Sequence, residues 1–181
     1  MDALELLLHP VRIRILHAFS GGRTRTTSQL CARLPDVSQA TVYRHVALLA
    51  EQGVLRVVDE QPVRGAVERH YGLDRELATV DRDAAAQMST DEHRRAFASA
   101  MAALLADFGS YLDHADADPD ADLVAYRQIP LWLSATELAT LVARMQAALA
   151  QVIANEQAAG RRQYLLSPIL FPVVESPDGT S

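Results

Sequence analysis

Apolar residues recur every three or four positions in the first part of the chain, and this spacing predicts three helices. The first spans residues 4–19, and its stable part starts near Pro10, because proline lacks an N–H and fits the first turn of a helix. The second covers residues 26–34 and opens with a Thr-x-x-Gln capping pattern. The third covers residues 38–52 and ends at Gly53, which suits the left-handed turn after a helix.

The periodicity changes after the third helix to short extended runs. These runs predict strands at residues 55–59 and 68–73, joined by a loop over residues 61–67 that contains proline and glycine. Two short helices joined by a short turn, with a β-hairpin directly behind them, predict a winged helix-turn-helix in which residues 59–69 form the wing.

A long amphipathic helix is predicted at residues 90–113, after a Ser-x-x-Glu capping box at Ser89. We expect its apolar face to pair with the same helix of a second copy, although the face could instead cover the chain's own core. That face carries Phe97, Met101, Leu104, Leu105, Phe108 and Leu112.

The rest of the chain predicts a strand-helix-strand module. An acidic linker at residues 113–122 precedes a strand at 123–133, a helix that starts at Ser134 and ends at Gly160, and a second strand at 162–174. The two strands could pair in parallel or be exchanged across a dimer. The expected fold is therefore mainly α with a small β component, and we divide it into residues 1–80 and 81–181.

The charge is distributed unevenly along the chain. Residues 1–75 hold ten arginines against eight carboxylates, whereas residues 76–181 hold seven against fifteen, and the whole chain has a net charge of −6. This asymmetry is compatible with nucleic-acid binding by the first half, since binding depends on the local field that faces the phosphates. All 17 basic residues are arginine, which excludes a lysine-based phosphate loop or Schiff base.

The composition is that of an ordinary globular protein. No apolar run is long enough to span a membrane, and the acidic N-terminus has neither a basic leader nor a cleavage site. Cys31 is the only cysteine, so the chain can form no internal disulfide and no cysteine-based metal site. We therefore expect a cytoplasmic protein.

Three stretches of the first half resemble the ArsR-type winged-helix regulators. They are residues 9–16 (HPVRIRIL), 38–46 (SQATVYRHV) and 49–55, and the resemblance covers roughly residues 5–75. It implies a homodimeric transcriptional regulator, often a repressor, whose third helix reads the operator. The Cys-x-Cys pair with which many relatives sense metals is missing, so metal-responsive repression is not carried over. Residues 41–44 (TVYR) are also similar to ferric-uptake-type regulators, but the histidine-rich metal cluster of that family is absent.

The candidate DNA contacts follow from the expected docking of the motif. The N-terminal half of the third helix enters the major groove first, while the start of the second helix and the wing lie on the phosphates. The apolar stripe of the third helix is Val42, Val46 and Leu49, and we expect it to face the core. His45 lies beside this stripe, so we expect it to be packed or hydrogen-bonded and leave it out of the set of DNA contacts. A solvated surface is the alternative for each contact. The set is Arg23, Arg25, Thr27, Ser38, Gln39, Thr41, Tyr43, Arg44, Arg64 and Arg69.

The second half offers a possible site for a small apolar effector. Its aromatic residues could line a pocket, or they could be core and interface residues. No resident cofactor or metal is expected, and the chain has no motif of a known enzyme class. The alternative to a double-stranded-DNA-binding regulator is a winged-helix module that binds proteins. The candidate pocket residues are Tyr126, Trp132, Tyr164 and Phe171.

Overall fold

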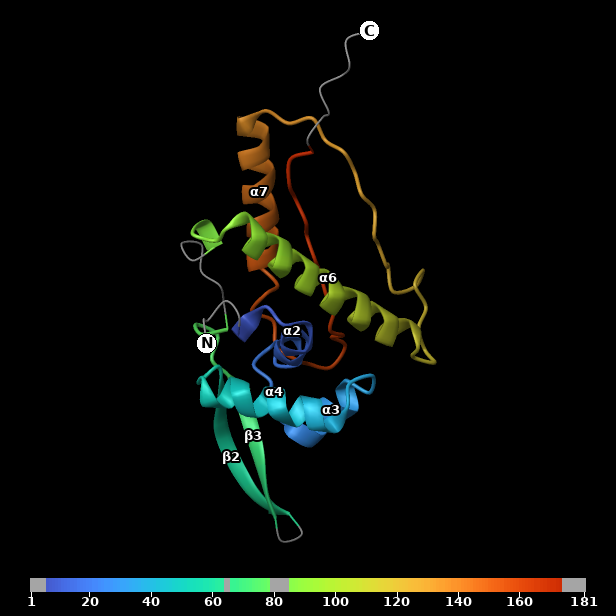
Figure 1. The fold of residues 1–181 in the computed structure, drawn as a ribbon. Coiled ribbons are helices and arrows are strands. Elements are labelled where there is room, and N and C mark those ends of the chain that lie inside the picture. Colours follow the sequence, from blue (N-terminus) through green and yellow to red (C-terminus); the bar gives the residue numbers. More distant parts are fainter. Residues whose placement is uncertain (1–5, 64–65, 79–84, 174–181) are drawn as a thin grey trace.

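A computed structural model of the 181-residue chain describes residues 6–63, 66–78 and 85–173 (Figure 1). The helices and strands follow one another along the chain as α2 (Pro10–His17), β1 (Arg25–Thr26), α3 (Thr27–Arg33), α4 (Gln39–Glu51), β2 (Leu55–Val63), β3 (Ala66–Leu73), α6 (Thr90–Leu112) and α7 (Ala135–Ala150).

The helices of the first half begin at the capping residues that the sequence predicts. Pro10 is the first residue of α2, and Nδ1 of His9 accepts the free N–H of Val11 at 3.2 Å. Thr26 forms a reciprocal capping box with Gln29 at the start of α3. The Ser38 hydroxyl caps α4 by accepting the N–H of Thr41. Each side chain satisfies a backbone donor that has no partner within the helix.

The hairpin spans the predicted residues 55–73, but its strands are longer and its loop is shorter than the sequence predicts. The three strands form an antiparallel sheet in the order β1-β3-β2, and β2 and β3 stay paired from Leu55↔Leu73 to Val63↔Ala66. The predicted loop at residues 61–67 is therefore wrong, because most of it belongs to the ladder. Pro62 lies on β2, an edge strand, where the missing N–H of proline is tolerated. β1 was not predicted, since two residues carry no periodic signal.

The hydrophobic core lies between α2, α3, α4 and the base of the wing. The stripe that was predicted on the third helix is buried, and Gly53 adopts a φ of +76° where the chain turns back toward the core. This packing holds the other face of α4 toward solvent. The largest fully buried side chains of the core are Phe19, Ile15, Leu30, Leu34, Leu49, Leu55, Val42, Val46 and Val54.

The long helix α6 packs across α2, on the side away from α4 and the wing (Figure 1). Its N-terminus is capped by the Ser89–Glu92 box, as predicted. The face turned to α2 carries small residues around Ala103, which is fully buried, together with Asp107 and Ser110. The small side chains allow the two helices to approach closely.

The C-terminal part differs from the predicted strand-helix-strand module. The helix forms, but it ends at Ala150 rather than at Gly160, which lies in a separate turn with a φ of +78°. Residues 124–134 and 161–173 contain no strand. In Figure 1 both segments run upward, whereas α7, which separates them along the chain, runs downward. A strand needs a neighbour for its backbone N–H and C=O groups, and these segments are not paired with each other.

None of the helices in the described ranges is both long enough and apolar enough to cross a lipid bilayer.

Candidate nucleic-acid interface

The exposed face of α4 carries the predicted base-reading residues. Val42 and Val46 point into the core, so the opposite face of the helix points outward. Gln39, Tyr43 and Arg44 are exposed, and the ring of Tyr43 is 54% accessible to solvent. These three side chains offer an amide, a phenol and a guanidinium on the first two turns of the helix. Such groups can bond base edges or phosphates in the major groove.

The hydroxyls of Ser38 and Thr41 are engaged with each other. Their oxygens lie 2.9 Å apart, and the Ser38 oxygen also accepts the Thr41 N–H. Ser38 is thus an N-cap, as the sequence predicts. Both residues lie at the exposed start of α4, so a phosphate could approach the same hydroxyls.

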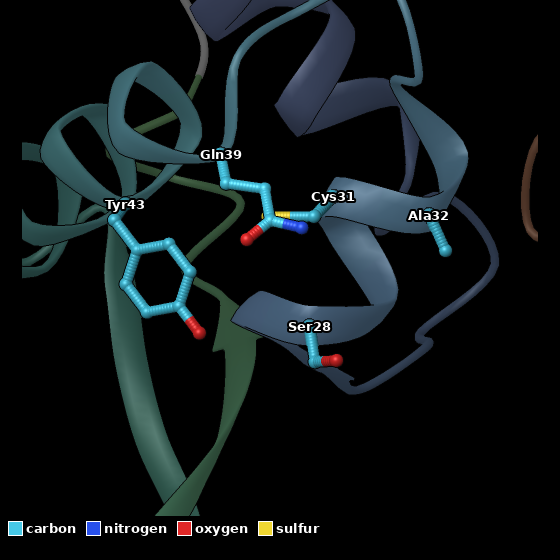
Figure 2. Close-up of a pocket in the computed structure, with 5 residues that line it drawn as sticks. All are labelled: Ser28, Cys31, Ala32, Gln39 and Tyr43. Atoms are coloured by element: carbon cyan, nitrogen blue, oxygen red, sulfur yellow. The ribbon is translucent and has the colours of Figure 1, made fainter.

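A hollow of about 260 Å³ separates the start of α4 from α3. Figure 2 shows Gln39 and Tyr43 on one side and Ser28, Cys31 and Ala32 of α3 on the other, with the Gln39 amide reaching toward Cys31. Two of the predicted base readers therefore lean toward the neighbouring helix. Burial raises the pKa of the Cys31 thiol, which disfavours the reactive thiolate.

Three arginines gather at the start and end of α3. Burial lowers the pKa of Arg25, and the nearby charges of Arg23 and Arg33 lower it further. The Gln163 amide oxygen accepts hydrogen bonds from Arg23 at 3.3 Å and from Arg33 at 3.1 Å, and the same amide donates to the His17 carbonyl. The sequence predicts phosphate contacts at Arg23 and Arg25 but not at Arg33, which follows no capping pattern. Nothing in the sequence indicates that the C-terminal segment reaches this cluster.

Thr27 is the first residue of α3 and is partly buried beside this cluster. It therefore lies where the sequence placed it, at the helix start.

Of the two phosphate contacts that the sequence predicts on the wing, Arg69 belongs to the residues that the structure describes. Arg69 lies within β3 opposite Glu60 of β2, rather than at the start of the strand, and its Nε donates to the Glu60 carboxylate at 3.0 Å. Both side chains are exposed, so this ion pair can exchange for a phosphate at little cost. Arg64 lies outside the described residues.

His45 lies under the recognition face and has no hydrogen-bond partner among the residues that the structure describes. It is 5% exposed, neither ring nitrogen is hydrogen-bonded, and its ring packs 4.5 Å from that of His9. Burial lowers its pKa to about 4, and the positive fields of His9, Arg12 and Arg44 add to the effect. The expectation of a packed histidine is correct, and its ring packs against another imidazole rather than forming a hydrogen bond. A buried, unpaired polar ring costs stability.

The apolar face of α6 points away from the domain that the helix packs against. On a helix of 3.6 residues per turn, Ala103 and Asp107 lie on the face opposite Met101 and Leu105. Leu105 is 74% exposed, and Phe97 and Leu112 are about half exposed, whereas Met101, Leu104 and Phe108 are partly buried. This large apolar face is thus available to a partner.

The four aromatic residues of the candidate effector pocket are all more than half exposed: Tyr126, Trp132, Tyr164 and Phe171. The Tyr126 ring lies edge-on to Phe108 of α6, with centroids 6.3 Å apart.

Residues 7–58 match the model of a helix-turn-helix domain family, from the residues just before α2 to the first part of β2. No curated protein matches the chain. The match agrees with the geometry above: the N-terminal domain is a helix-turn-helix followed by a β-hairpin wing. A domain of this class indicates a DNA-binding transcriptional regulator rather than an enzyme.

Proposed function

We propose that the protein is a homodimeric repressor that binds an inverted repeat in double-stranded DNA. In this proposal residues 1–80 bind DNA and residues 81–181 pair the two protomers. The third helix, residues 38–52, lies in the major groove, and the wing lies on the phosphates. The observation that carries the proposal is the set of exposed polar side chains on the first turns of α4, Gln39, Tyr43 and Arg44, next to an arginine cluster.

The arrangement of charges supports DNA over a protein partner for this face. Arg23 and Arg33 lie close enough to Arg25 for their charges to lower its pKa, and the neutral Gln163 amide bridges Arg23 and Arg33. Phosphates would supply negative charge to this cluster. A protein-binding face would instead be expected to have an apolar centre with few charged groups. A dimer bound at a promoter would exclude the polymerase, which is the basis for proposing repression.

The proposal is tested by selecting duplexes from a random pool with the full chain. We expect an enriched inverted repeat whose half-sites lie about one helical turn apart, and an affinity that falls steeply with salt. The matched control is a duplex of scrambled sequence, which should bind only weakly at physiological salt. Failure to enrich any sequence would contradict the proposal.

Dimerisation through α6 gives a separate prediction. Replacing Leu105 with glutamate should weaken the dimer at least about tenfold, because a charge would be buried against the partner's apolar face. The monomer should stay folded, since Leu105 points away from α2. Sedimentation at several concentrations measures the change.

Ala102→Glu is the matched control, because Ala102 is also exposed on α6 but lies beside the apolar face rather than on it. It should leave the dimer intact. Equal sedimentation of Leu105→Glu and the wild type would show that this face does not pair the protomers.

We also propose that the exposed aromatic residues of the second half, Tyr126, Trp132, Tyr164 and Phe171, include the contacts of a small apolar effector. Trp132 is the only tryptophan of the chain and is exposed, so its fluorescence reports on binding beside it. A saturable emission change on titration with apolar compounds is expected, and it should be lost in Phe171→Ala. Emission that no compound alters would count against the proposal.

A further inference from the structure

The helix α2 lies between α6 on one side and α4 on the other (Figure 1). One charged side chain of α2, Arg14, connects both sides. Its guanidinium is 3% exposed, which is unusual for an arginine. Burial of a charge is tolerated only when opposite charges and hydrogen bonds compensate for the lost water.

Arg14 makes four hydrogen bonds to two distant segments of the chain. Nη1 and Nη2 donate to the two carboxylate oxygens of Asp36, at 2.6 and 2.9 Å. Nε donates to the Asp107 carboxylate at 2.7 Å, and Nη2 also reaches the Ser110 hydroxyl at 3.3 Å. Asp36 lies in the turn between α3 and α4, two residues before the N-cap of α4, whereas Asp107 and Ser110 lie one turn apart on α6.

The pKa shifts of Asp36 and Asp107 agree with both carboxylates sharing the Arg14 guanidinium. The hydrogen bond from Arg14 lowers the pKa of Asp36. Burial acts to raise the pKa of Asp107, but the hydrogen bonds from His17 and Arg14 outweigh it, so the net shift is downward. Both carboxylates are therefore ionised at neutral pH and both bond to the one guanidinium. His17, one turn after Arg14 on α2, holds the second oxygen of Asp107 at 3.1 Å.

We infer that Arg14 is a positioning residue that couples the long helix α6 to the turn leading into the recognition helix. The planar fork of the guanidinium fixes the two segments relative to each other through one rigid group. A lysine could not replace it, because a single ammonium cannot make the bidentate bond to Asp36 and the Nε bond to Asp107 together.

The functional part of this inference rests on the proposed function. If the outer face of α6 pairs two copies, its inner face transmits the geometry of the dimer through Arg14 to each recognition helix. The link is serial: α6 holds Arg14 through Asp107, and Arg14 holds the turn through Asp36. Breaking it at either point should loosen the same connection.

DNA binding tests the serial link in the full-length protein. The probe is the tightest duplex that the wild type selects from a random pool. Asp36→Asn and Asp107→Asn should each weaken binding about three- to tenfold, in the range of known coupling effects. The double variant should bind DNA no more weakly than whichever single variant binds less tightly, because either substitution alone already breaks the link through Arg14. Multiplication of the two single effects would overturn the inference.

Hydrogen exchange tests the coupling without DNA. In the folded protein, Asp107→Asn and Arg14→Lys should both speed the exchange of backbone amides in residues 34–41, although Asp107 belongs to another element. The matched control is Asp113→Asn, which removes the same charge from the exposed end of α6 and should leave these amides unchanged. Unaltered exchange in residues 34–41 for Asp107→Asn and Arg14→Lys would overturn the inference.

The two experiments separate the inference from the function on which it rests. If the wild type selects no duplex, the proposed function fails, and the exchange experiment alone decides whether Arg14 couples α6 to the turn.

Discussion

Replacing Arg44 with alanine should weaken binding to the selected duplex by about 1–3 kcal/mol, or roughly five- to 150-fold. Arg44 is exposed on the second turn of α4, where its guanidinium can donate two hydrogen bonds to a guanine, one to O6 and one to N7. The loss should be largest for the selected sequence and smaller for a scrambled duplex. Fluorescence anisotropy with both duplexes measures the two affinities.

Arg144→Ala is the matched control for this variant. Arg144 is also an exposed arginine on a helix, but α7 carries no predicted DNA contact. It should bind as the wild type does, apart from the small general effect of one lost charge. If both variants lose the same amount for both duplexes, Arg44 contributes only general charge and does not read a base.

Replacing His45 with leucine should stabilise the fold by about 1–3 kcal/mol, because it removes two buried nitrogens that lack partners. Leucine is close to histidine in size and can keep the packing contact with the His9 ring. Unfolding by urea at neutral pH measures the gain. A loss of stability in this variant would show that the histidine ring makes polar contacts in solution.

The lowered pKa of His45 also makes the stability of the fold depend on pH. The His45 pKa is about 4 in the folded state and near 6.5 in the unfolded state, so between these values the unfolded chain binds more protons. Stability should therefore be complete above about pH 6.5 and fall as the pH drops toward 4, by up to about 3 kcal/mol. His9 shifts in the same direction and adds to the loss.

Most of this decline between pH 6.5 and 4 should disappear in His45→Leu. The matched control is His93→Gln, which removes an exposed histidine on α6 and should keep the decline. An unchanged decline in His45→Leu would assign the pH dependence to other groups.

The sequence predicted well those features that depend on neighbouring residues. The helix starts at Pro10, Thr27, Gln39 and Thr90 follow from proline or from a capping side chain within a few residues. The outward face of α4 follows from the helical period of its buried valines. These signals are local, so one sequence suffices to detect them.

The features that depend on distant partners could not be predicted in this way. Residues 124–134 and 161–173 have the apolar composition of strands, but a strand also requires a paired neighbour, which composition does not supply. The strands of the wing were predicted too short, because Pro62 indicates a loop unless the strand is known to lie at the edge of a sheet.

The contacts of Arg14 show the same limit within the domain. Arg14 lies three residues after Val11 and four before Ala18, so the helical period places it on the apolar face, but nothing nearby in the sequence identifies the groups that pair with its charge. Its partners Asp36 and Asp107 are 22 and 93 residues away. Only the packing of α6 on α2 brings these groups together.

The central claim is that two copies of α4 read the major groove of one DNA site. It is tested most directly by dimethyl sulfate protection of guanine N7, a major-groove atom, on the selected duplex with and without Arg44→Ala. The account predicts two clusters of protected guanines about one helical turn apart, with protection lost in the variant. Tight binding without major-groove protection, or protection that persists in Arg44→Ala, would contradict it.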